Sequence, residues 1–448
     1  MSYTVKIITL GCPKNQVDSR QIGGFLLQEG FVLTENTAEA QIIVVNTCGF
    51  IEEAKKESLE SIFEMLQWKE KGVCRYLIAA GCLAQKYEKE LSTEIPEIDA
   101  IIGTGDIPKL PEILNQLINK RSAAEKIVSV GSPNAFLYSN DVPEQPPETP
   151  YAYLKIAEGC DNACSYCVIP QMRGSYRSRK REDILSEAAS MVRKGIKELI
   201  LVAQDTTLYG YDLYGRLELP ALLRELVKIP DLAWVRILYA YPNNITDDLL
   251  ETIRTEEKIC SYLDIPLQHI SDNILMRMGR RITKEDTEEI IRKIRRSVPG
   301  IVLRSTFIIG FPGETKEDFN TLLNFLREAQ FDRAGFFAYS REPDTRAAGF
   351  DNQVNRQILS RRLNKAVKLQ KEILAVKQSD KIGQEVTVIT DGPSADYAEL
   401  WEGRTAGDAP EIDGLVYFKP GLGQRPGDFV RLKVTHSQDF ALMGEIIA

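Results

Sequence analysis

The apolar positions in the first third of the chain form short runs that alternate with longer amphipathic segments. Segments 20–30 and 51–66 carry apolar residues at helical spacing, and we expect a loop at 11–19. Strands alternating with such helices predict a doubly wound parallel sheet, α/β in class, in an N-terminal domain over 1–135. The expected strands are VKIITL (5–10), QIIVVN (41–46), RYLIAA (75–80) and IDAIIGTG (98–105).

The alternation returns after a segment rich in Pro and polar residues, which we interpret as a linker over 136–150. Six βα units over 151–378 predict a partial (β/α)6 barrel, whose active face lies at the carboxyl ends of the strands. Over 379–448 short β-rich runs separated by Gly, Pro and Asp predict a small all-β barrel. The central strands are expected at YAYLKIAEGC, KELILVAQ, WVRILYAYP, SYLDIPLQ, IVLRSTFIIG and AGFFAYS.

Composition narrows the class of protein. The chain has 448 residues, 43% of them apolar, and a net charge of −8, which does not indicate a general nucleic-acid-binding surface. Eight cysteines are too few for a disulfide scaffold and fit thiolate ligands in a reducing compartment. The sequence contains no signal-peptide pattern and no apolar run of about 20 residues, so we expect a cytoplasmic protein without a membrane span.

Three cysteines of the first block follow expected strands. Cys12, Cys48 and Cys82 each lie within a few residues of a strand's carboxyl end. Because such ends share one edge of a parallel sheet, the three thiols are expected to meet at one site. The alternative is that they are buried small hydrophobes, which is how we interpret Cys74 and Cys260 at the opposite strand ends.

A second cysteine set lies in one short loop, GCDNACSYC, where Cys160, Cys164 and Cys167 have CxxxCxxC spacing. Three thiolates leave one coordination position open, whereas a closed zinc or all-cysteine Fe–S site uses four ligands. A zinc knuckle with a distant fourth ligand is the alternative, but the chain supplies only His269 and His436 as histidines. The set therefore favours an Fe–S cluster with one open iron.

The loop, with an aromatic residue just before its last Cys, resembles the radical S-adenosylmethionine (SAM) enzymes. The order of blocks, ending in a small barrel similar to a TRAM domain, resembles their methylthiotransferase family across essentially the whole chain. Within that family, the sequence looks like the ribosomal-protein branch, known as RimO. The segments that carry this likeness are NTCGFIEEAKKES, AEGCDNACSYCVIPQMRG, LVAQDTTLYG, YAYPNNIT and PLQHISDNIL. REPDT at 341–345 departs from the Glu-Glu-Gly-Thr common in relatives, which affects only the expected loop conformation.

The resemblance implies cofactors and a reaction. Cys160, Cys164 and Cys167 would hold a [4Fe–4S] cluster that binds SAM, and the three N-terminal cysteines would hold a second [4Fe–4S] cluster. A radical derived from SAM would remove hydrogen from the β-carbon of an aspartate in a small-subunit ribosomal protein. Sulfur from the second cluster and a methyl group from another SAM would complete the product. The alternatives are methylthiolation of a tRNA adenosine and a non-catalytic Fe–S or zinc protein that binds nucleic acid.

Other candidate residues have an ordinary structural alternative. Tyr166 would stack on adenine or simply pack in its loop. Gln204 and Asp205 would receive the methionyl amino group, although Asp205 is equally suited to cap a helix. A turn formed by Gly310, Phe311, Pro312 and Gly313 would let the backbone approach SAM.

Two further features concern charge. The run at 173–181 holds Arg173, Arg177, Arg179, Lys180 and Arg181, and is expected to be a solvated face or to clamp a carboxylate of SAM or substrate. His269 is expected to be a satisfied polar residue near a strand end.

Residues 380–448 carry twelve Asp and Glu against six Lys and Arg, a balance of −6. An acidic barrel suits a basic ribosomal protein and makes tRNA an unlikely partner; the alternative is that the acidic residues only confer solubility. A low-potential electron donor such as flavodoxin is the other expected partner.

Overall fold

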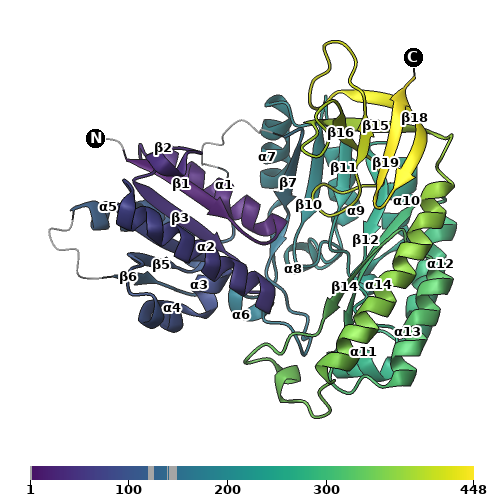
Figure 1. Ribbon diagram of the computed structural model, residues 1–448, viewed down its shortest axis with the longest axis horizontal. Coiled ribbons are helices and arrows are strands. Elements are labelled where there is room, and N and C mark those ends of the chain that lie inside the picture. Colours follow the sequence, from purple (N-terminus) through teal and green to yellow (C-terminus); the bar gives the residue numbers. More distant parts are fainter. Residues whose placement is uncertain (1–2, 120–125, 139, 141–148, 448) are drawn as a thin grey trace.

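The computed structural model describes residues 3–119, 126–138, 140 and 149–447 and contains three parts (Figure 1). An N-terminal α/β domain lies beside a larger central α/β domain, and a small β-barrel at the C-terminus packs on the central domain. Residues 139 and 141–148 of the expected linker lie outside the described residues. No helix among the described residues is long and apolar enough to cross a membrane.

The N-terminal domain is a six-stranded parallel sheet in the order β2-β1-β3-β4-β5-β6. Apolar residues of α1 and α5 cover one face and those of α2, α3 and α4 cover the other, so the predicted doubly wound sheet is confirmed. The strands are β1 (Thr4–Thr9), β2 (Val32–Leu33), β3 (Ile42–Thr47), β4 (Tyr76–Gly81), β5 (Ala100–Ile102) and β6 (Ile127–Ser129). The helices are α1 (Pro13–Gln28), α2 (Glu52–Lys71), α3 (Cys82–Lys86), α4 (Glu88–Glu94) and α5 (Leu110–Asn119).

The start of α1 differs from the prediction. Residues 13–19 were expected in a loop, but the helix begins at Pro13, directly after Cys12. Proline suits the first position of a helix because its ring fixes φ and it has no N–H to leave unpaired. This early start brings Lys14, Asn15 and Asp18 onto a helix that begins at the edge of the sheet.

The central domain is an open sheet of six parallel strands in the order β14-β13-β12-β11-β10-β7, which confirms the partial barrel. Its strands are β7 (Tyr151–Lys155), β10 (Glu198–Val202), β11 (Trp234–Ile237), β12 (Ile259–Asp264), β13 (Val302–Ile309) and β14 (Arg333–Ala338). The short strands β8 (Ala157–Glu158) and β9 (Arg177–Ser178) form a separate pair. The helices are α6 (Ile169–Arg173), α7 (Arg181–Arg193), α8 (Tyr211–Tyr214), α9 (Leu219–Leu226), α10 (Asp247–Thr255), α11 (Asp272–Met278), α12 (Lys284–Ser297), α13 (Lys316–Ala329) and α14 (Arg356–Ser379).

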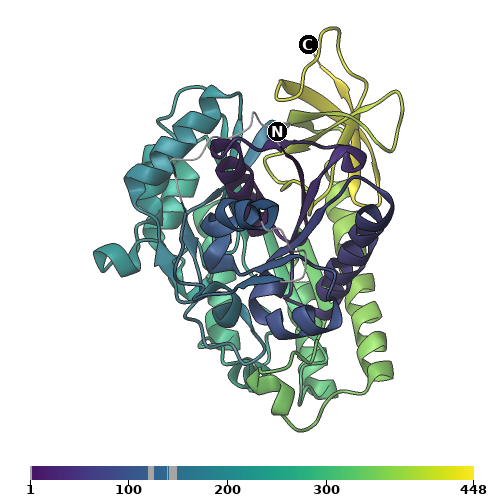
Figure 2. The same cartoon turned by 90° about the vertical axis from the view of Figure 1, so that its left-hand side faces the viewer.

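The two faces of the central sheet have different partners. Helices cover the outer face with a large apolar core. On the inner face, Val17 of α1 and Ile389 of the C-terminal barrel pack against Tyr153 and Ile200 of the sheet. Figure 2 shows the N-terminal domain in front of the central strands. The other two domains therefore cover the inner face of the open sheet.

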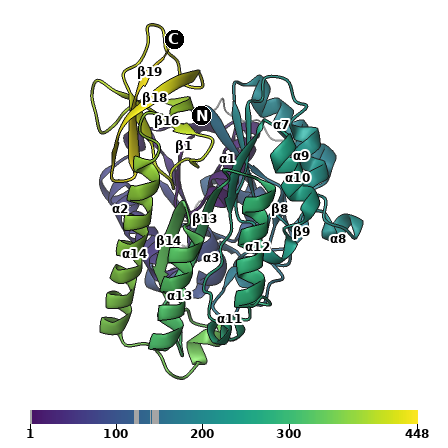
Figure 3. The same cartoon turned by 90° about the vertical axis from the view of Figure 1, so that its right-hand side faces the viewer.

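The C-terminal part is a closed antiparallel-rich barrel in the order β15-β16-β17-β19-β18, as predicted. Its small core contains residues such as Val388, Phe418 and Leu432. Helix α14 leads from the central domain to the barrel (Figure 3). The strands are β15 (Glu385–Pro393), β16 (Trp401–Thr405), β17 (Val416–Phe418), β18 (Phe429–Gln438) and β19 (Ala441–Ile446).

Some of the acidic residues of this barrel are bound by the rest of the chain. Asp408 pairs with Arg333 at 2.5 Å, and Asp413 accepts a hydrogen bond from the Tyr262 hydroxyl at 2.7 Å. Glu411 accepts hydrogen bonds from Gln16 and Tyr151. These three carboxylates bind the barrel to the rest of the chain, although Glu411 is also exposed to solvent.

Candidate active site between two cysteine sets

The N-terminal cysteines lie at neighbouring strand ends. Cys12 is the N-cap of α1 after β1, Cys48 follows β3, and Cys82 is the first residue of α3 after β4. Gly11 has a φ of +89°, and a Cβ there would lie 2.8 Å from the Cys48 sulfur, so only glycine lets the chain pass so close. Burial, with smaller contributions from the nearby Cys48 and Cys12 and against the opposing charge of Arg173, raises the pKa of the Cys82 thiol to about 12. The three cysteines therefore follow neighbouring strands of the sheet, and their role as ligands of one cluster stays a prediction.

The second set begins after β8. Gly159, with a φ of +83°, precedes Cys160, and a Cβ at Gly159 would lie 1.9 Å from the Ser175 carbonyl oxygen. Cys160 is buried, Cys164 and Cys167 are partly exposed, and the Cys167 sulfur accepts a hydrogen bond from the Ile169 amide at 3.4 Å. Burial raises the pKa of Cys160 to about 11. Among the described residues, no three His, Cys, Asp or Glu side chains are grouped as ligands of a single metal ion would be.

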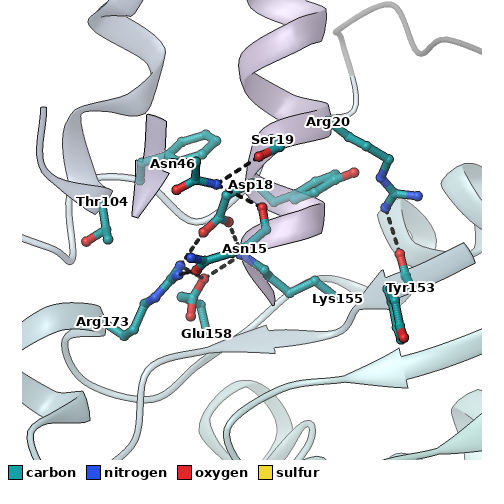
Figure 4. A network of polar contacts seen from close by, with 12 residues as sticks. Asn15, Asp18, Ser19, Arg20, Asn46, Thr104, Tyr153, Lys155, Glu158 and Arg173 are labelled. Atoms are coloured by element: carbon teal, nitrogen blue, oxygen red, sulfur yellow. Dashed lines mark hydrogen bonds and ion pairs between the residues drawn. The ribbon is translucent and has the colours of Figure 1, made fainter. Parts of the chain in front are cut away.

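A buried polar network joins α1 of the N-terminal domain to the first part of the central domain (Figure 4). Arg173 donates from Nη1 to Asp18 Oδ2 at 2.5 Å and to Glu158 Oε2 at 3.3 Å. Lys155 Nζ donates to the same two carboxylates, at 2.5 and 2.6 Å. Arg173 also donates from Nε to Cys82 Sγ at 3.1 Å. Two cations and two carboxylates therefore compensate one another in a place from which water is excluded.

Gln204 extends the network toward the second cysteine set. Its amide nitrogen donates to Glu158 Oε1 at 2.5 Å, while its Oε1 is buried without a hydrogen-bond partner among the described residues. Asp205 Oδ1 accepts hydrogen bonds from Thr207 Oγ1 and from the Leu208 amide. These bonds cap the following turn, which is the alternative to cofactor binding that the sequence left open. Its Oδ2 lies 3.5 Å from Asn162 Nδ2 of the cysteine loop. Gln204 thus presents a free acceptor, and Asp205 holds the loop.

Tyr166 and the Gly310–Gly313 turn lie together. The rings of Tyr166 and Phe311 meet edge to face with centroids 6.3 Å apart, and Phe311 is fully buried. Gly310 has a φ of +75°, and the space its Cβ would take belongs to Leu359 of α14. The glycines therefore serve the backbone conformation and close packing of the turn on the protein itself.

Glu314 and His269 support this turn from behind. The Gly310 amide donates to Glu314 Oε2 at 2.8 Å, and Arg362 donates to Oε1 at 2.6 Å. His269 is fully buried; its Nδ1 accepts from the Ser271 amide at 3.0 Å, and its Nε2 lies 3.6 Å from Glu314. His269 is therefore an internal residue, but the expectation of a satisfied polar group is wrong for its Nε2, which has no hydrogen-bond partner among the described residues.

Four residues near the cysteines were missed from the sequence: Lys14, Tyr239, Tyr241 and Arg280. Tyr239 and Tyr241 follow β11, and Arg280 follows α11. The Arg280 guanidinium lies 4.3 Å from the Tyr241 ring, hydrogen-bonds to Pro266 O, and acts electrostatically on Cys164. Its Nε is buried without a partner among the described residues. The only sequence signal that could have identified these four residues was their position, because each follows a strand end or a helix at the active face.

The basic run at 173–181 is largely internal, so the expectation of a solvated face is wrong for Arg173 and Arg179. Arg179 is 3% exposed and donates to Glu187 Oε2 at 2.6 Å. Arg177 is half-buried and donates to backbone carbonyls, among them those of Pro133 and Phe136. Arg173 and Arg179 bind carboxylates of the chain itself, because the N-terminal domain brings Asp18 to the first and α7 brings Glu187 to the second.

Cys74 and Cys260 are buried, as expected; Cys74 lies among apolar residues, and Cys260 lies between apolar residues and the buried Arg236. Burial raises the pKa of Cys74 to about 11 and that of Cys260 to about 12. Neither belongs to a cysteine set.

Comparisons with known families match three regions of the chain, which correspond to the three parts of the structure. Family models match the radical SAM superfamily over residues 154–326, the uncharacterized protein family UPF0004 over 4–103, and the TRAM domain over 382–447. Among solved structures, the radical SAM methyltransferase TsrM of Kitasatospora setae, with cobalamin and a [4Fe-4S] cluster bound, has a TM-score of 0.54 at 17% identity. That match covers 78% of this chain and 74% of TsrM. At this identity, the likeness shows the fold alone.

Full-length relatives are much closer in sequence. The ribosomal protein uS12 methylthiotransferase RimO of Pelotomaculum thermopropionicum is 47% identical over 448 residues, which is the whole of both chains. The protein of the same name in Geobacter sulfurreducens is 47% identical over 445 residues, covering 99% of this chain and 98% of that one. Sequence, domain order and the two cysteine sets agree: the chain belongs to the RimO family of radical SAM methylthiotransferases.

Proposed function

We propose that this protein transfers a methylthio group to the β-carbon of an aspartate in ribosomal protein uS12, using SAM and two [4Fe–4S] clusters. The observation that carries the proposal is the pairing of two three-cysteine sets across one buried network. Arg173 contacts Cys82 of one set and Glu158, two residues before Cys160 of the other. A reaction that needs a radical source and a sulfur source at one carbon requires two such sites in fixed register.

The residues present fit these groups. Each cysteine set offers three thiols at the carboxyl edge of a parallel sheet, which is the donor set of a cluster with one open iron. Gln204 Oε1 and Arg280 Nε are buried polar atoms without protein partners among the described residues. A methionyl ammonium would satisfy the first and a methionyl carboxylate the second, because buried polar groups are almost always hydrogen-bonded. Tyr166 would border the adenine.

When bound, the cluster and SAM supply a radical able to remove hydrogen from an unactivated carbon. The chain's own residues orient and shield that chemistry. Glu158 accepts from the Gln204 amide nitrogen, which turns the Gln204 carbonyl oxygen away as an acceptor. The fully buried Phe311 and the Gly310 turn close the site beside Tyr166. Rigid side chains around both cysteine sets hold the target carbon in place and exclude water.

The partners follow from this function. The substrate is uS12, free or in the small ribosomal subunit, so the protein works in the cytoplasm. A low-potential donor such as flavodoxin supplies the electron. Asp408, Glu411 and Asp413 are bound by the rest of the chain, and the other acidic residues of the C-terminal barrel favour a basic protein over tRNA.

One experiment separates this function from its alternatives. Anaerobically reconstituted enzyme with SAM and a reductant is given uS12 and tRNA together, and both are analysed by mass spectrometry. We expect uS12 to gain a methylthio group in place of one hydrogen and tRNA to remain unchanged. Modification of an adenosine in tRNA would instead establish the other branch. Cluster binding without SAM cleavage would favour a non-catalytic protein.

A further inference from the structure

Lys14 lies where the N-terminal and central domains meet, between the two cysteine sets. It lies two residues after Cys12, in the first turn of α1. Its Nζ is 3.4 Å from the centroid of the Tyr239 ring, which belongs to the central domain. An ammonium at this distance from an aromatic face makes a cation–π contact. The first turn of α1 therefore places a positive charge over the active face of the central sheet.

Unlike its neighbours, this cation has no carboxylate partner. Lys155 and Arg173, at the same junction, are each paired with Asp18 and Glu158. Lys14 is half-buried, and no Asp or Glu of the described part of the chain forms an ion pair with it; its contacts are Tyr239 and, electrostatically, Cys12 and Arg173. Partly buried charges are usually paired, so this ammonium is available to an anion that comes from outside the chain.

The Tyr239 platform is rigid. Tyr239 has a φ of +60°, a left-handed conformation that is costly for a tyrosine. Its amide donates to Asp264 Oδ2 at 3.1 Å, and its carbonyl oxygen accepts from the Thr206 amide at 3.1 Å. Backbone strain that is held this firmly is typical of functional sites.

The same segment reaches the second cysteine set. Two residues after Tyr239, Tyr241 lies against Arg280. Burial raises the pKa of Tyr241, and Cys164 and Cys160 are close enough to add to that effect. Residues 239–241 thus run from the Cys12 side of the junction to the Cys160 side. In the proposed reaction, the target carbon loses a hydrogen atom to a radical on the Cys160 side and gains sulfur from the Cys12 side. Such a carbon would lie against this segment, next to Lys14.

We propose that Lys14 binds the side-chain carboxylate of the aspartate that is modified. This inference rests on the proposed function. The reacting β-carbon is bonded directly to that carboxylate, so holding the carboxylate fixes the carbon with it. The contact is an ion pair formed in a partly buried site, where charge-assisted hydrogen bonds are strongest. Lys14 thereby distinguishes aspartate from asparagine and from side chains without charge.

The competing role for Lys14 is to balance the charge of the Cys12 site alone. A double-mutant cycle on binding separates the two roles. Reconstituted full-length enzyme with SAM, but without reductant, is titrated with uS12 and with uS12 in which the modified aspartate is replaced by asparagine. We expect the wild-type enzyme to bind the aspartate form about 10- to 100-fold more tightly. Lys14→Gln should bind both forms alike, and Lys14→Arg should keep part of the preference.

Iron content and visible absorption of each variant are measured alongside. If Lys14→Gln retains the full preference for aspartate, the proposal is wrong. If Lys14→Gln loses iron from the N-terminal set, the lysine serves the cluster and the proposal is also wrong. If the wild-type enzyme modifies uS12 without discriminating aspartate from asparagine in binding, only the role of Lys14 fails. If it neither binds nor modifies uS12, the proposed function fails as well.

Discussion

Arg173 Nε donates a hydrogen bond to Cys82 Sγ at 3.1 Å, across the boundary between the central and N-terminal domains. The same guanidinium donates to Asp18 and Asn15 of α1. One side chain therefore holds a thiol of the first cysteine set and the helix that begins at Cys12. Because Arg173 ends α6, which follows the cysteine loop, it also fixes the second set relative to the first.

Replacing Arg173 by Gln should destabilise the protein by about 3–5 kcal/mol, because Asp18 and Glu158 would lose one of their two buried cations. Urea unfolding of the full-length protein measures the cost. Arg177→Gln is the matched control, since Arg177 is half-buried and its hydrogen bonds go to backbone carbonyls. Equal destabilisation by the two substitutions would show that the buried network is not what joins the domains.

Removing either cysteine set should remove one cluster. Cys12→Ala combined with Cys48→Ala and Cys82→Ala should halve the iron bound after reconstitution. Changing Cys160, Cys164 and Cys167 to Ala should abolish formation of 5′-deoxyadenosine and leave the N-terminal cluster in place.

Cys74→Ala and Cys260→Ala are the controls for these variants, because both thiols are buried outside the two sets. Their iron content should match that of the wild type. An iron content that does not fall when Cys12, Cys48 and Cys82 are all replaced would rule out the N-terminal cluster.

Periodicity and strand ends were enough to predict much of this arrangement. Cys12, Cys48 and Cys82 could be brought together because each follows an apolar run, and parallel strands end at a common edge. The burial and ion pairing of Arg173 could not be predicted, because its partner Asp18 lies 155 positions away in another domain. A charged residue at such a junction looks in sequence like one on a solvated face.

The same limit applies to Lys14 and to the start of α1. The sequence PKNQVDS has the composition of a loop, yet it forms the first turns of a helix that packs on the central sheet. Tertiary packing, here that of Val17 against the inner face, overrides the weak local preference. The contact of Lys14 with Tyr239 follows from that packing and has no local signal.

Gly310→Ala should lower the free energy of unfolding by more than 2 kcal/mol, an order-of-magnitude sum of left-handed backbone strain and overpacking. A Cβ at Gly310 would lie 2.6 Å from Cδ1 of Leu359. Gly300→Ala isolates the strain, because Gly300 has a φ of +79° with no atom within 4 Å of the added Cβ. We expect only about 1 kcal/mol there.

Thermal unfolding measures how much each substitution lowers the free energy of unfolding, and SAM titration measures its effect on SAM binding. Gly310→Ala should weaken SAM binding because the turn packs beside Tyr166, whereas Gly300→Ala should not. Equal costs for both glycines would mean that the turn adjusts freely and that its close packing is unimportant.

Acid should loosen the C-terminal barrel. Glu198 is fully buried and accepts hydrogen bonds from Arg236 at 2.7 Å and from Arg404 of the barrel at 2.6 Å. Burial by itself raises the pKa of Glu198, but the two guanidinium groups outweigh it and hold the pKa below its ordinary value of 4.5. The stabilisation is therefore complete above that value and is lost as the pH falls below it toward the folded-state pKa.

The check is the difference in free energy of unfolding between wild type and Glu198→Gln, measured on full-length protein without clusters at a series of pH values. The difference should be constant near neutral pH and shrink below about pH 4.5. A difference that grows on acidification would contradict the assignment of a lowered pKa to Glu198.

The central claim is that a hydrogen atom leaves an aspartate β-carbon of uS12 and a methylthio group takes its place between the two cysteine sets. The most direct measurement uses uS12 labelled with deuterium at the aspartate β-carbons, reconstituted enzyme, SAM and reductant, with mass spectrometry of both products. We predict deuterium in 5′-deoxyadenosine and a methylthio group on a single aspartate that has lost one deuterium. Deuterium-free 5′-deoxyadenosine together with unmodified uS12 would contradict the account.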